Sequence, residues 1–310
     1  MKRFAITLKS TVAALALMAA PAFAADPLVD VAWLKDNLGA DNMVVVDARG
    51  STDFLRGHIP GAVNTDYGKD GWRVKVGNVP GVFPEDPTAL GQMIGNLGIG
   101  DDTHVVVVAP GNDSSDMGTA TRIYWTFKVL GHDEVSVLNG GMAAWLKEVD
   151  GSNNPVNPLD KGAVEPTPAS FTVDLQEDMI PDETEVQAMF DSGALPVDNR
   201  TEDQYLGVNK HGAAKAYGTI PGAVNLPQSW LTVDGGGTFR DADTLMKLYA
   251  AAGVPTEGPE VNFCNTGHWA SIGWFVSSEL LGNEEAVMYD PSMVGWTDKG
   301  LPVEAAVSLK

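Results

Sequence analysis

The sequence contains one ordered set of motifs twice, and this internal repeat restricts the possible fold more than any other feature. The first copy includes VVVDARGSTDFLRGHIPGAVN at 44–64, and the second includes LPVDNRTEDQYLGVNKHGAAKAYGTIPGAVN at 195–225. Both copies begin with a short apolar run that ends in Asp-x-Arg, and both close on Ile-Pro-Gly-Ala-Val-Asn. Two such halves predict two copies of one domain.

The correspondence continues in the same order through later segments. LGIGDDTHVVVVA at 97–109 corresponds to AGVPTEGPEVNFC at 252–264, and VLGHDEVSVLNGGMAAW at 129–145 corresponds to LLGNEEAVMYDPSMVGW at 280–296. Counting back from Gly131 as one counts back from Gly282 places Asp113 opposite Cys264, within a longer loop. The first copy therefore has no thiol at the matching place.

The apolar runs in both copies are short and rich in β-branched residues, which is typical of strands buried on both faces of a parallel sheet. They alternate with helical stretches at 86–98 and 241–253, each of which begins at an Asp suited to N-capping and ends at a Gly suited to the C-terminal turn. The expected fold class is α/β, with two tandem domains that each hold a mostly parallel sheet with helices on both faces.

The segment 151–170 separates the halves and is rich in Pro, Gly, Ser and Asn without apolar periodicity. This composition predicts a linker. The expected organisation is a first domain at 25–150, the linker at 151–170 and a second domain at 171–310.

The first residues predict export. Lys2, Arg3 and Lys9 precede or interrupt the apolar stretch TVAALALMAA, and Ala22-Phe23-Ala24 supplies small residues where a signal peptidase reads them. Residues 1–24 are read as a secretory signal peptide, because the apolar run is about half of what a bilayer core requires. We expect a periplasmic protein that is not held in the membrane.

The net charge of −21 disfavours binding to nucleic acid or to an anionic membrane surface.

Cys264 is the only cysteine of the chain. Exported proteins that use cysteine for stability carry it in pairs, so a lone thiol is either an inert apolar residue or a nucleophile. It ends a predicted strand and precedes a predicted helix that ends near Gly282. Ligands bind outside the carboxyl ends of parallel strands, and the N–H groups at a helix start stabilise anions. This placement favours a thiolate nucleophile.

These features together resemble the two-domain rhodaneses, which are the thiosulfate and 3-mercaptopyruvate sulfurtransferases. The tandem halves, the Asp-x-Arg strand end, the Ile-Pro-Gly-Ala-Val-Asn turn and the Cys-x-x-Gly loop carry the resemblance, which covers nearly the whole chain after residue 24. It implies a sulfurtransferase whose first domain lacks the cysteine, shapes the cleft and does no chemistry. Phosphatases on the same fold use a longer loop, Cys-x5-Arg, whereas Ala270 stands at that position here.

The resemblance also implies the chemistry. Cys264 would take a sulfur from a small sulfur-containing anion, become a persulfide, and pass the sulfur to cyanide, a thiol or a protein acceptor. The N–H groups of 265–269 would hold the negative charge of the persulfide. No cofactor is expected, and the scattered His and Met residues show no metal-ligand spacing.

The loop after Cys264 leaves the donor open. Thiosulfate enzymes usually read Cys-Arg-Lys-Gly and mercaptopyruvate enzymes Cys-Gly-Ser-Gly, whereas this chain has Asn265 and Thr266 at the two variable positions. Gln204 stands where many relatives have a donor-binding arginine, so Lys210, His211 or Lys215 are candidates for the missing charge. For Arg200, a structural role competes with direct contact. The expected substrate-binding residues are Asn265, Thr266, Gly267, His268, Trp269, Arg200, Lys210 and His211.

Two other functions stay open. The absence of the usual donor cations is compatible with a periplasmic sulfur carrier or binding module that is loaded by a protein partner and turns over little small-molecule donor. An inert scaffold with a buried thiol is the third reading, and it predicts that Cys264 resists alkylation in the folded protein.

Overall fold

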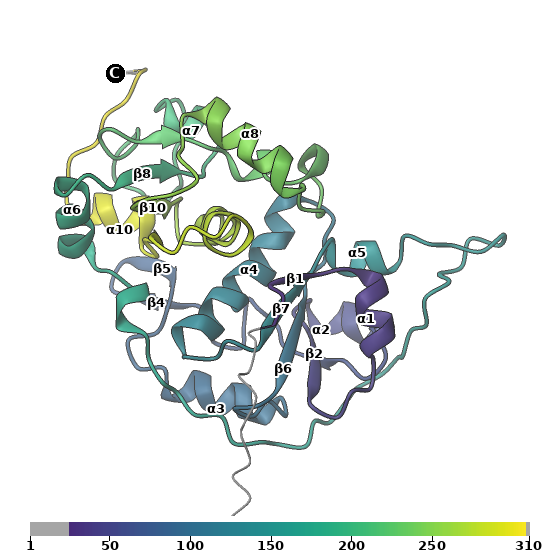
Figure 1. Ribbon diagram of the computed structural model, residues 1–310. Coiled ribbons are helices and arrows are strands. Elements are labelled where there is room, and N and C mark those ends of the chain that lie inside the picture. Colours follow the sequence, from purple (N-terminus) through teal and green to yellow (C-terminus); the bar gives the residue numbers. More distant parts are fainter. Residues whose placement is uncertain (1–24, 308–310) are drawn as a thin grey trace, which may run out of the picture.

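The computed structural model describes residues 25–307 and contains two α/β domains joined by a long irregular segment (Figure 1). The predicted signal peptide lies outside the described residues. Within 25–307, every helix is too short or too polar to cross a membrane. The predicted fold class is confirmed in both halves, because each domain has a parallel sheet with helices on its faces.

The first domain is built on a five-stranded sheet of order β1-β7-β6-β2-β3, in which all neighbours are parallel. Its strands are β1 (Leu28–Val29), β2 (Met43–Asp47), β3 (Val63–Asn64), β6 (His104–Val108) and β7 (Val135–Leu138). Its helices are α1 (Val31–Asn37), α2 (Ser51–Arg56), α3 (Thr88–Asn96), α4 (Ser114–Val129) and α5 (Gly141–Trp145). An antiparallel hairpin of β4 (Val74–Val76) and β5 (Val79–Val82) leaves this sheet.

Alternation along β6 explains why the run VVVV is buried on both faces. Val105 and Val107 belong to the core that includes α3 and α4, whereas Val106 and Val108 belong to the core that includes α1, α2 and α5. Successive side chains of a strand point to opposite faces, so a continuous apolar run fits only a strand covered on both sides.

The second domain has a four-stranded parallel sheet of order β11-β10-β8-β9. Its strands are β8 (Leu195–Asp198), β9 (Val224–Asn225), β10 (Glu260–Phe263) and β11 (Ala286–Met288). Its helices are α6 (Glu183–Asp191), α7 (Glu202–Tyr205), α8 (Ala242–Ala252), α9 (Ala270–Trp274), which continues as a π-helical turn over Phe275–Leu280, and α10 (Ser292–Asp298). Short 3₁₀ turns lie at Glu177–Met179, Gln228–Trp230 and Val233–Gly235.

Both predicted helices form. The side chain of Asp241 accepts the N–H of Thr244 at 2.8 Å and caps α8, and Gly253 closes that helix in the left-handed conformation. The helix expected over 86–98 begins slightly later, at Thr88, because Pro87 occupies the cap position. The carboxylate of Asp86 still accepts the N–H of Thr88 at 2.9 Å.

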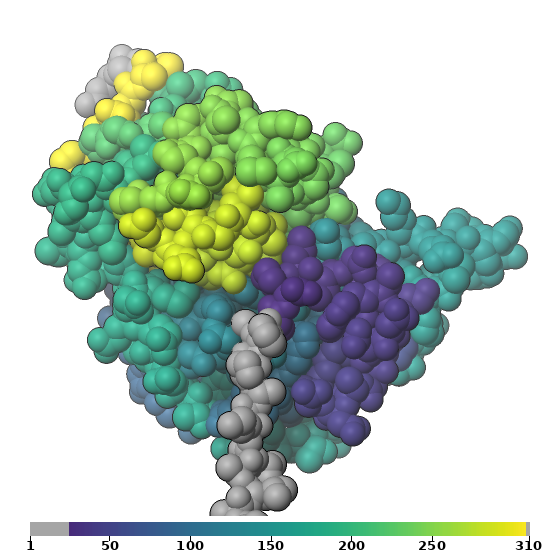
Figure 2. Space-filling model, in the orientation of Figure 1, coloured from purple at the N-terminus to yellow at the C-terminus, as the bar shows by residue number. Residues whose placement is uncertain are grey.

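The two domains contact each other through reciprocal elements. Helix α4 runs between them, and the Thr121 hydroxyl lies 2.8 Å from that of Ser271 on α9 (Figure 1). In Figure 2 the green and yellow second domain lies directly on the purple and blue first domain. Asn139 of the first domain accepts the N–H of Phe239 at 2.9 Å, and Asp290, its counterpart in the second, accepts the N–H of Phe83 at 2.7 Å. The repeat therefore extends to the way the domains meet.

The segment between α5 and the 3₁₀ turn at Glu177 contains only isolated bridges and returns along α3 (Figure 1). Its Ala169 donates its N–H to the carbonyl of Gly95 at 2.9 Å. A Cβ added at Gly91 or Gly95 would lie 2.6 Å from Val173 or 2.7 Å from the Ala169 carbonyl. Glycine at these positions of α3 is what permits this close approach. The exact linker and domain boundaries stay predictions.

Candidate active site

Cys264 follows the last residue of β10, as predicted. Strand β10 is the centre of three paired strands, so the position of Cys264 is fixed from both sides of the sheet. Its carbonyl accepts the N–H of Met293 at 3.1 Å, which ties it to the start of α10. The residue is 1% exposed, and it belongs to the main core cluster. The nucleophile candidate is thus a buried, rigidly placed thiol.

The counterpart of Cys264 in the first domain is Ala109, so the assignment of Asp113 was wrong. In the strand register Asp47 pairs with Val108 as Asp198 pairs with Phe263, and the next residues are Ala109 and Cys264. The Ala109 carbonyl accepts the N–H of Met142 at 2.8 Å, which repeats the Cys264–Met293 bond. Asp113 instead caps α4. The helix after the strand is longer in the first domain, since α4 has 16 residues whereas α9 has 5 and its π-helical continuation 6. Counting back from the helix end therefore misplaces the register.

Ser292 organises the loop around the thiol. Its hydroxyl oxygen accepts the N–H groups of Cys264 at 3.0 Å and Gly267 at 3.2 Å, and it donates to the carbonyl of Tyr289 at 2.9 Å. The same oxygen lies 4.0 Å from the sulfur of Cys264. The backbone of Ser292 has φ +50°, in the left-handed region, and its counterpart in the first domain is Gly141 with φ +55°. Serine is strained in a conformation that favours glycine, and here its hydroxyl is the acceptor for two backbone N–H groups of the loop.

The other N–H groups of the loop remain available. The N–H groups of Asn265, Thr266, His268 and Trp269 have no acceptor within residues 25–307. They lie between Cys264 and the start of α9, where backbone N–H groups favour an anion. The proposed role of 265–269 in holding negative charge stays a prediction. The N–H group of Gly267 already donates to the hydroxyl of Ser292.

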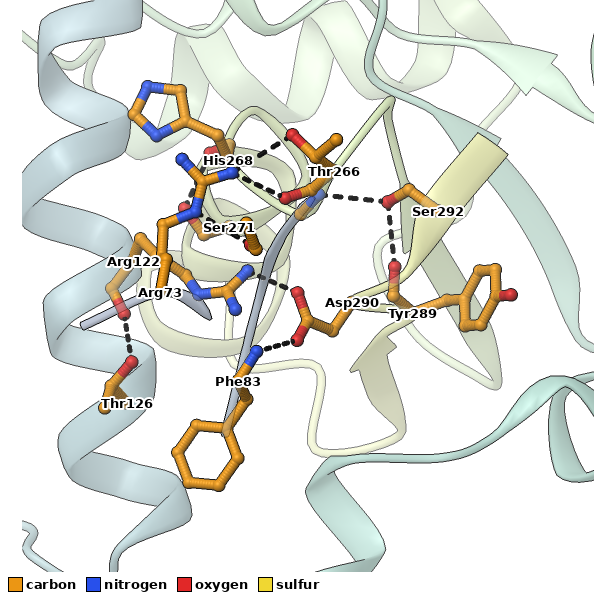
Figure 3. Close-up of polar contacts among 12 residues, drawn as sticks. Arg73, Phe83, Arg122, Thr126, Thr266, His268, Ser271, Tyr289, Asp290 and Ser292 are labelled. Atoms are coloured by element: carbon orange, nitrogen blue, oxygen red, sulfur yellow. Dashed lines mark hydrogen bonds and ion pairs between the residues drawn. The ribbon is translucent and has the colours of Figure 1, made fainter. Parts of the chain in front are cut away.

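Gly267 lies directly over an ion pair that joins the two domains. Arg122 of α4 contacts Asp290, which follows β11, with Nη1 and Oδ1 2.6 Å apart (Figure 3). A Cβ added at Gly267 would lie 2.1 Å from Arg122 Nη1 and 2.3 Å from Asp290 Oδ1. Gly267 also has φ +76°. Glycine is therefore required both by the turn and by the close approach of the ion pair.

The first domain also contacts the loop through Arg73. Its Nη2 donates to the carbonyl of Thr266 at 3.0 Å and to the Thr266 hydroxyl at 3.1 Å (Figure 3). Its Nε donates to the carbonyl of Gly81 at 2.8 Å, which fixes the guanidinium on the hairpin. Sequence reasoning missed Arg73 and Arg122. The available signal for Arg122 was a cation inside an otherwise apolar helical run, ATRIYWTF.

His268 and Trp269 dock the loop on the first domain. His268 Nε2 lies 2.9 Å from the carbonyl of Ser115 and must donate to it, so Nδ1 accepts from the hydroxyl of Tyr67 at 3.0 Å. Trp269 donates its indole N–H to the hydroxyl of Ser115 at 2.9 Å. Burial, with Arg73 nearby, lowers the pKa of His268 to about 4, so the ring is neutral near pH 7. Burial raises the pKa of Tyr67, which keeps its hydroxyl a donor.

Gln204 reaches the loop, although it carries no charge. Its side-chain carbonyl accepts from the amide of Asn265 at 2.8 Å, and Asn265 is buried. The position where many relatives have an arginine therefore does lie beside the loop. In this chain the contact is an amide pair.

Of the two roles considered for Arg200, its contacts support the structural one, and its predicted contact with substrate stays a prediction. It is 1% exposed, donates to both oxygens of Asp198, and donates to the carbonyl of Gly218 at 2.9 Å. Arg49 in the first domain repeats this with Asp47 and the carbonyl of Gly57. The same arrangement in a domain without a thiol indicates support of the fold.

Lys210 and His211 lie in the segment after α7. Lys210 Nζ donates to the carbonyl of Ala214 at 2.6 Å and lies 5.5 Å from the ring centre of Tyr217. His211 Nδ1 accepts the N–H of Ala213 at 3.2 Å. Within the described chain neither residue, nor the ammonium of Lys215, forms a hydrogen bond to 264–269. The structure does not bring these predicted cations into contact with the loop.

Two doubly covered parallel sheets, with a lone cysteine between a strand and a helix where the domains meet, define a tandem α/β protein with a candidate thiol nucleophile. The rhodanese-like domain family matches at residues 30–148 and 182–299. A relative in Mycolicibacterium smegmatis is 32% identical over 292 residues, which cover 92% of this chain and 98% of that protein. The thiosulfate sulfurtransferase of Bos taurus is 30% identical over 293 residues, covering 89% and 93%.

A solved structure shares the fold. SseA from Escherichia coli, described as a 3-mercaptopyruvate sulfotransferase, superposes with a TM-score of 0.70 at 24% identity and covers 86% of this chain and 98% of its own. The chain belongs to the rhodanese family. It is accordingly an enzyme of the sulfurtransferase class.

Proposed function

We propose that this enzyme moves a sulfane sulfur from thiosulfate or 3-mercaptopyruvate, through a persulfide on Cys264, to a thiophilic acceptor such as cyanide or a thiol. The observation that carries the proposal is the setting of Cys264. The lone thiol lies at a strand end, beside a loop whose N–H groups at Asn265, Thr266, His268 and Trp269 have no acceptor within 25–307. Such groups stabilise an anionic sulfur because they require no reorganisation when charge arrives.

In the first step the Cys264 thiolate attacks the sulfane sulfur of the donor. With thiosulfate, the new Cys264–sulfur bond forms as the bond to the sulfonate group breaks, and sulfite leaves with the electron pair. With 3-mercaptopyruvate the carbon–sulfur bond breaks, and the departing enolate takes up the thiol proton to give pyruvate. In both cases Cys264 ends as an anionic persulfide, whose charge the free N–H groups of the loop would hold.

In the second step the acceptor attacks the outer sulfur. Cyanide leaves as thiocyanate, and the electron pair of the broken sulfur–sulfur bond returns to Cys264 as a thiolate. The absence of any second cysteine in the chain favours this cycle, since a neighbouring thiol would convert the persulfide into a disulfide.

Intact mass measurement tests the proposal. The folded protein is exposed briefly to thiosulfate or to 3-mercaptopyruvate and then to cyanide, with Cys264→Ser as the matched control. We expect a gain of one sulfur that cyanide removes as thiocyanate, and no gain in the variant. A single sulfur that is gained but not released to small acceptors would favour the protein-loaded carrier. No gain from either donor would overturn the proposal.

We also propose that the chain acts in the periplasm after removal of residues 1–24. The support is the cationic start, the apolar stretch and the Ala22-Phe23-Ala24 site of the sequence. The amino-terminal residue of the protein recovered from a periplasmic fraction tests this. Ala25 is the expected first residue, and an intact Met1 in the cytoplasm would contradict it.

A further inference from the structure

We propose that Arg73, supplied by the first domain, is the anion-binding residue for the sulfur donor and the positioning residue for Thr266. This inference rests on the proposed sulfur transfer at Cys264 and identifies the charge that selects the donor. It assigns to the first domain a direct part in donor binding, whereas the sequence predicted only a shaping of the cleft.

The guanidinium of Arg73 is held firmly, yet one of its nitrogens is unused. Nε is fixed by the carbonyl of Gly81, and Nη2 by the carbonyl and hydroxyl of Thr266. Nη1 makes no hydrogen bond within residues 25–307, and it is not among the side-chain nitrogens sealed from solvent. A preorganised, partly buried guanidinium with a free donor beside the Cys264 loop is suited to bind an anion.

The positive charge of Arg73 also has no carboxylate partner within the described residues. The side chains of Arg49, Arg122 and Arg200 each contact a carboxylate at 2.5–2.6 Å, so their charge is neutralised locally. Among the arginines of the described range, only Arg73 and Arg240 have no carboxylate within ion-pair distance. Arg73 is the one of these two that touches the loop.

An unpaired cation matters in this chain because the overall field opposes the donor. The net charge is −21, and both thiosulfate and 3-mercaptopyruvate are anions. The side chains of Asn265 and Gln204 carry no charge, and they bond to each other beside the thiol. Arg73 supplies from the opposite domain the charge that these positions lack.

Arg73 also orients Thr266. The Thr266 hydroxyl oxygen accepts from Nη2, so its own proton points elsewhere, and it has no acceptor within 25–307. The proton is therefore free to donate to a bound anion two residues from Cys264. Loss of Arg73 removes both the positive charge and this orientation.

The test compares Arg73→Gln with Arg240→Gln. Arg240 is the matched control, because it too lacks a carboxylate partner and its Nε donates to a backbone carbonyl, that of Trp230, at 2.8 Å. We expect Arg73→Gln to raise the KM for thiosulfate at least about tenfold, the effect of losing a charged hydrogen bond. Arg240→Gln is expected to leave KM unchanged. Arg73→Lys retains the charge without the second hydrogen bond and should recover part of the loss.

A second readout separates anion binding from loop support and does not depend on sulfur transfer. Cys264 is alkylated with anionic iodoacetate and with neutral iodoacetamide, and the ratio of the two rates is measured in each protein. We expect the ratio to fall severalfold in Arg73→Gln and to stay constant in Arg240→Gln. If both rates change equally in Arg73→Gln, Arg73 only supports the loop and the inference is overturned.

The two readouts also distinguish this inference from the proposed function. A ratio that falls in Arg73→Gln, in a protein that gains no sulfur from either donor, would retain the anion site and remove the proposed reaction. If Arg73→Gln instead forms the persulfide normally, with an unchanged ratio and an unchanged KM, the proposed reaction is retained and the anion site at Arg73 is overturned. Should Arg73→Gln fold poorly by circular dichroism, Arg73→Lys decides through its own KM and ratio.

Discussion

Arg122 Nη1 lies 2.6 Å from Asp290 Oδ1, across the boundary between the two domains. The exposed fractions of the two side chains are 0% and 7%. The second oxygen of Asp290 accepts the N–H of Phe83, so one carboxylate holds both α4 and the end of the hairpin (Figure 3). Because Gly267 lies directly on this pair, the ion pair supports the Cys264 loop from the first domain.

Removing one partner of the Arg122–Asp290 ion pair should lower the free energy of unfolding more than removing both partners. Asp290→Asn leaves the buried charge of Arg122 without a counterion, and we expect a loss of about 3–5 kcal/mol in the free energy of unfolding. The double variant Arg122→Met with Asp290→Asn should recover part of that loss, since methionine can pack against Trp125, whose ring lies 4.6 Å from the guanidinium carbon.

Urea unfolding of the single and double variants measures this coupling. Arg56→Gln is the control, because its pair with Asp53 is exposed and should contribute less than about 1 kcal/mol. Additive effects of the two single substitutions would show that the buried pair is not coupled.

Gly267→Ala should destabilise the protein by more than the backbone strain alone. An alanine at φ +76° costs about 1–2 kcal/mol, and its Cβ would in addition push Arg122 and Asp290 apart. Gly282→Ala is the matched control, since Gly282 has φ +79° and nothing within 4 Å of an added Cβ. We expect Gly282→Ala to show only the strain and to keep its sulfur-transfer rate. Equal losses of stability in the two variants would mean that the loop adapts without disturbing the ion pair.

Ser292 should be replaceable by glycine more easily than by alanine. Alanine retains the left-handed strain and loses the hydroxyl, whereas glycine loses only the hydroxyl, so Ser292→Ala should be less stable than Ser292→Gly by about 1–2 kcal/mol. Both variants leave the N–H groups of Cys264 and Gly267 without their acceptor. We therefore expect both to slow persulfide formation, measured by mass in single turnover. An unchanged rate in Ser292→Gly would show that the hydroxyl does not order the loop.

The fold and the thiol were predictable because their signals are local or repeated. The run VVVV reads as a strand covered on both faces, the Asp241 and Gly253 ends define α8, and the repeat places Cys264 after β10. The register error at Asp113 arose because the helix that follows the strand is longer in the first copy, with 16 residues in α4 against 5 in α9 and 6 in its π-helical continuation. In that region the repeat carries no information about which residues align.

The surroundings of the thiol were not predictable, because they come from the other domain. Arg73 and Thr266 are 193 residues apart in the sequence, and Arg122 and Asp290 are 168 apart. Nothing in the local pattern shows which faces of two independent domains meet. Sequence reasoning therefore sought the missing cation on the second domain, at Lys210, His211 and Lys215.

His268 should make stability fall as the pH falls below about 6.5. Its pKa is about 4 in the folded protein and 6.5 when unperturbed, so between these values the unfolded chain takes up a proton that the folded protein does not. The contribution of this histidine is complete above pH 6.5 and is lost progressively towards pH 4. The slope for one such group is at most about 1.4 kcal/mol per pH unit.

His268→Gln cannot be protonated and still has one donor and one acceptor for Ser115 and Tyr67. Urea unfolding at pH 7.5, 6 and 5 should show wild type losing more stability than His268→Gln as the pH falls. A difference that stays constant with pH would mean that the ring is protonated in the folded protein as readily as in the unfolded chain.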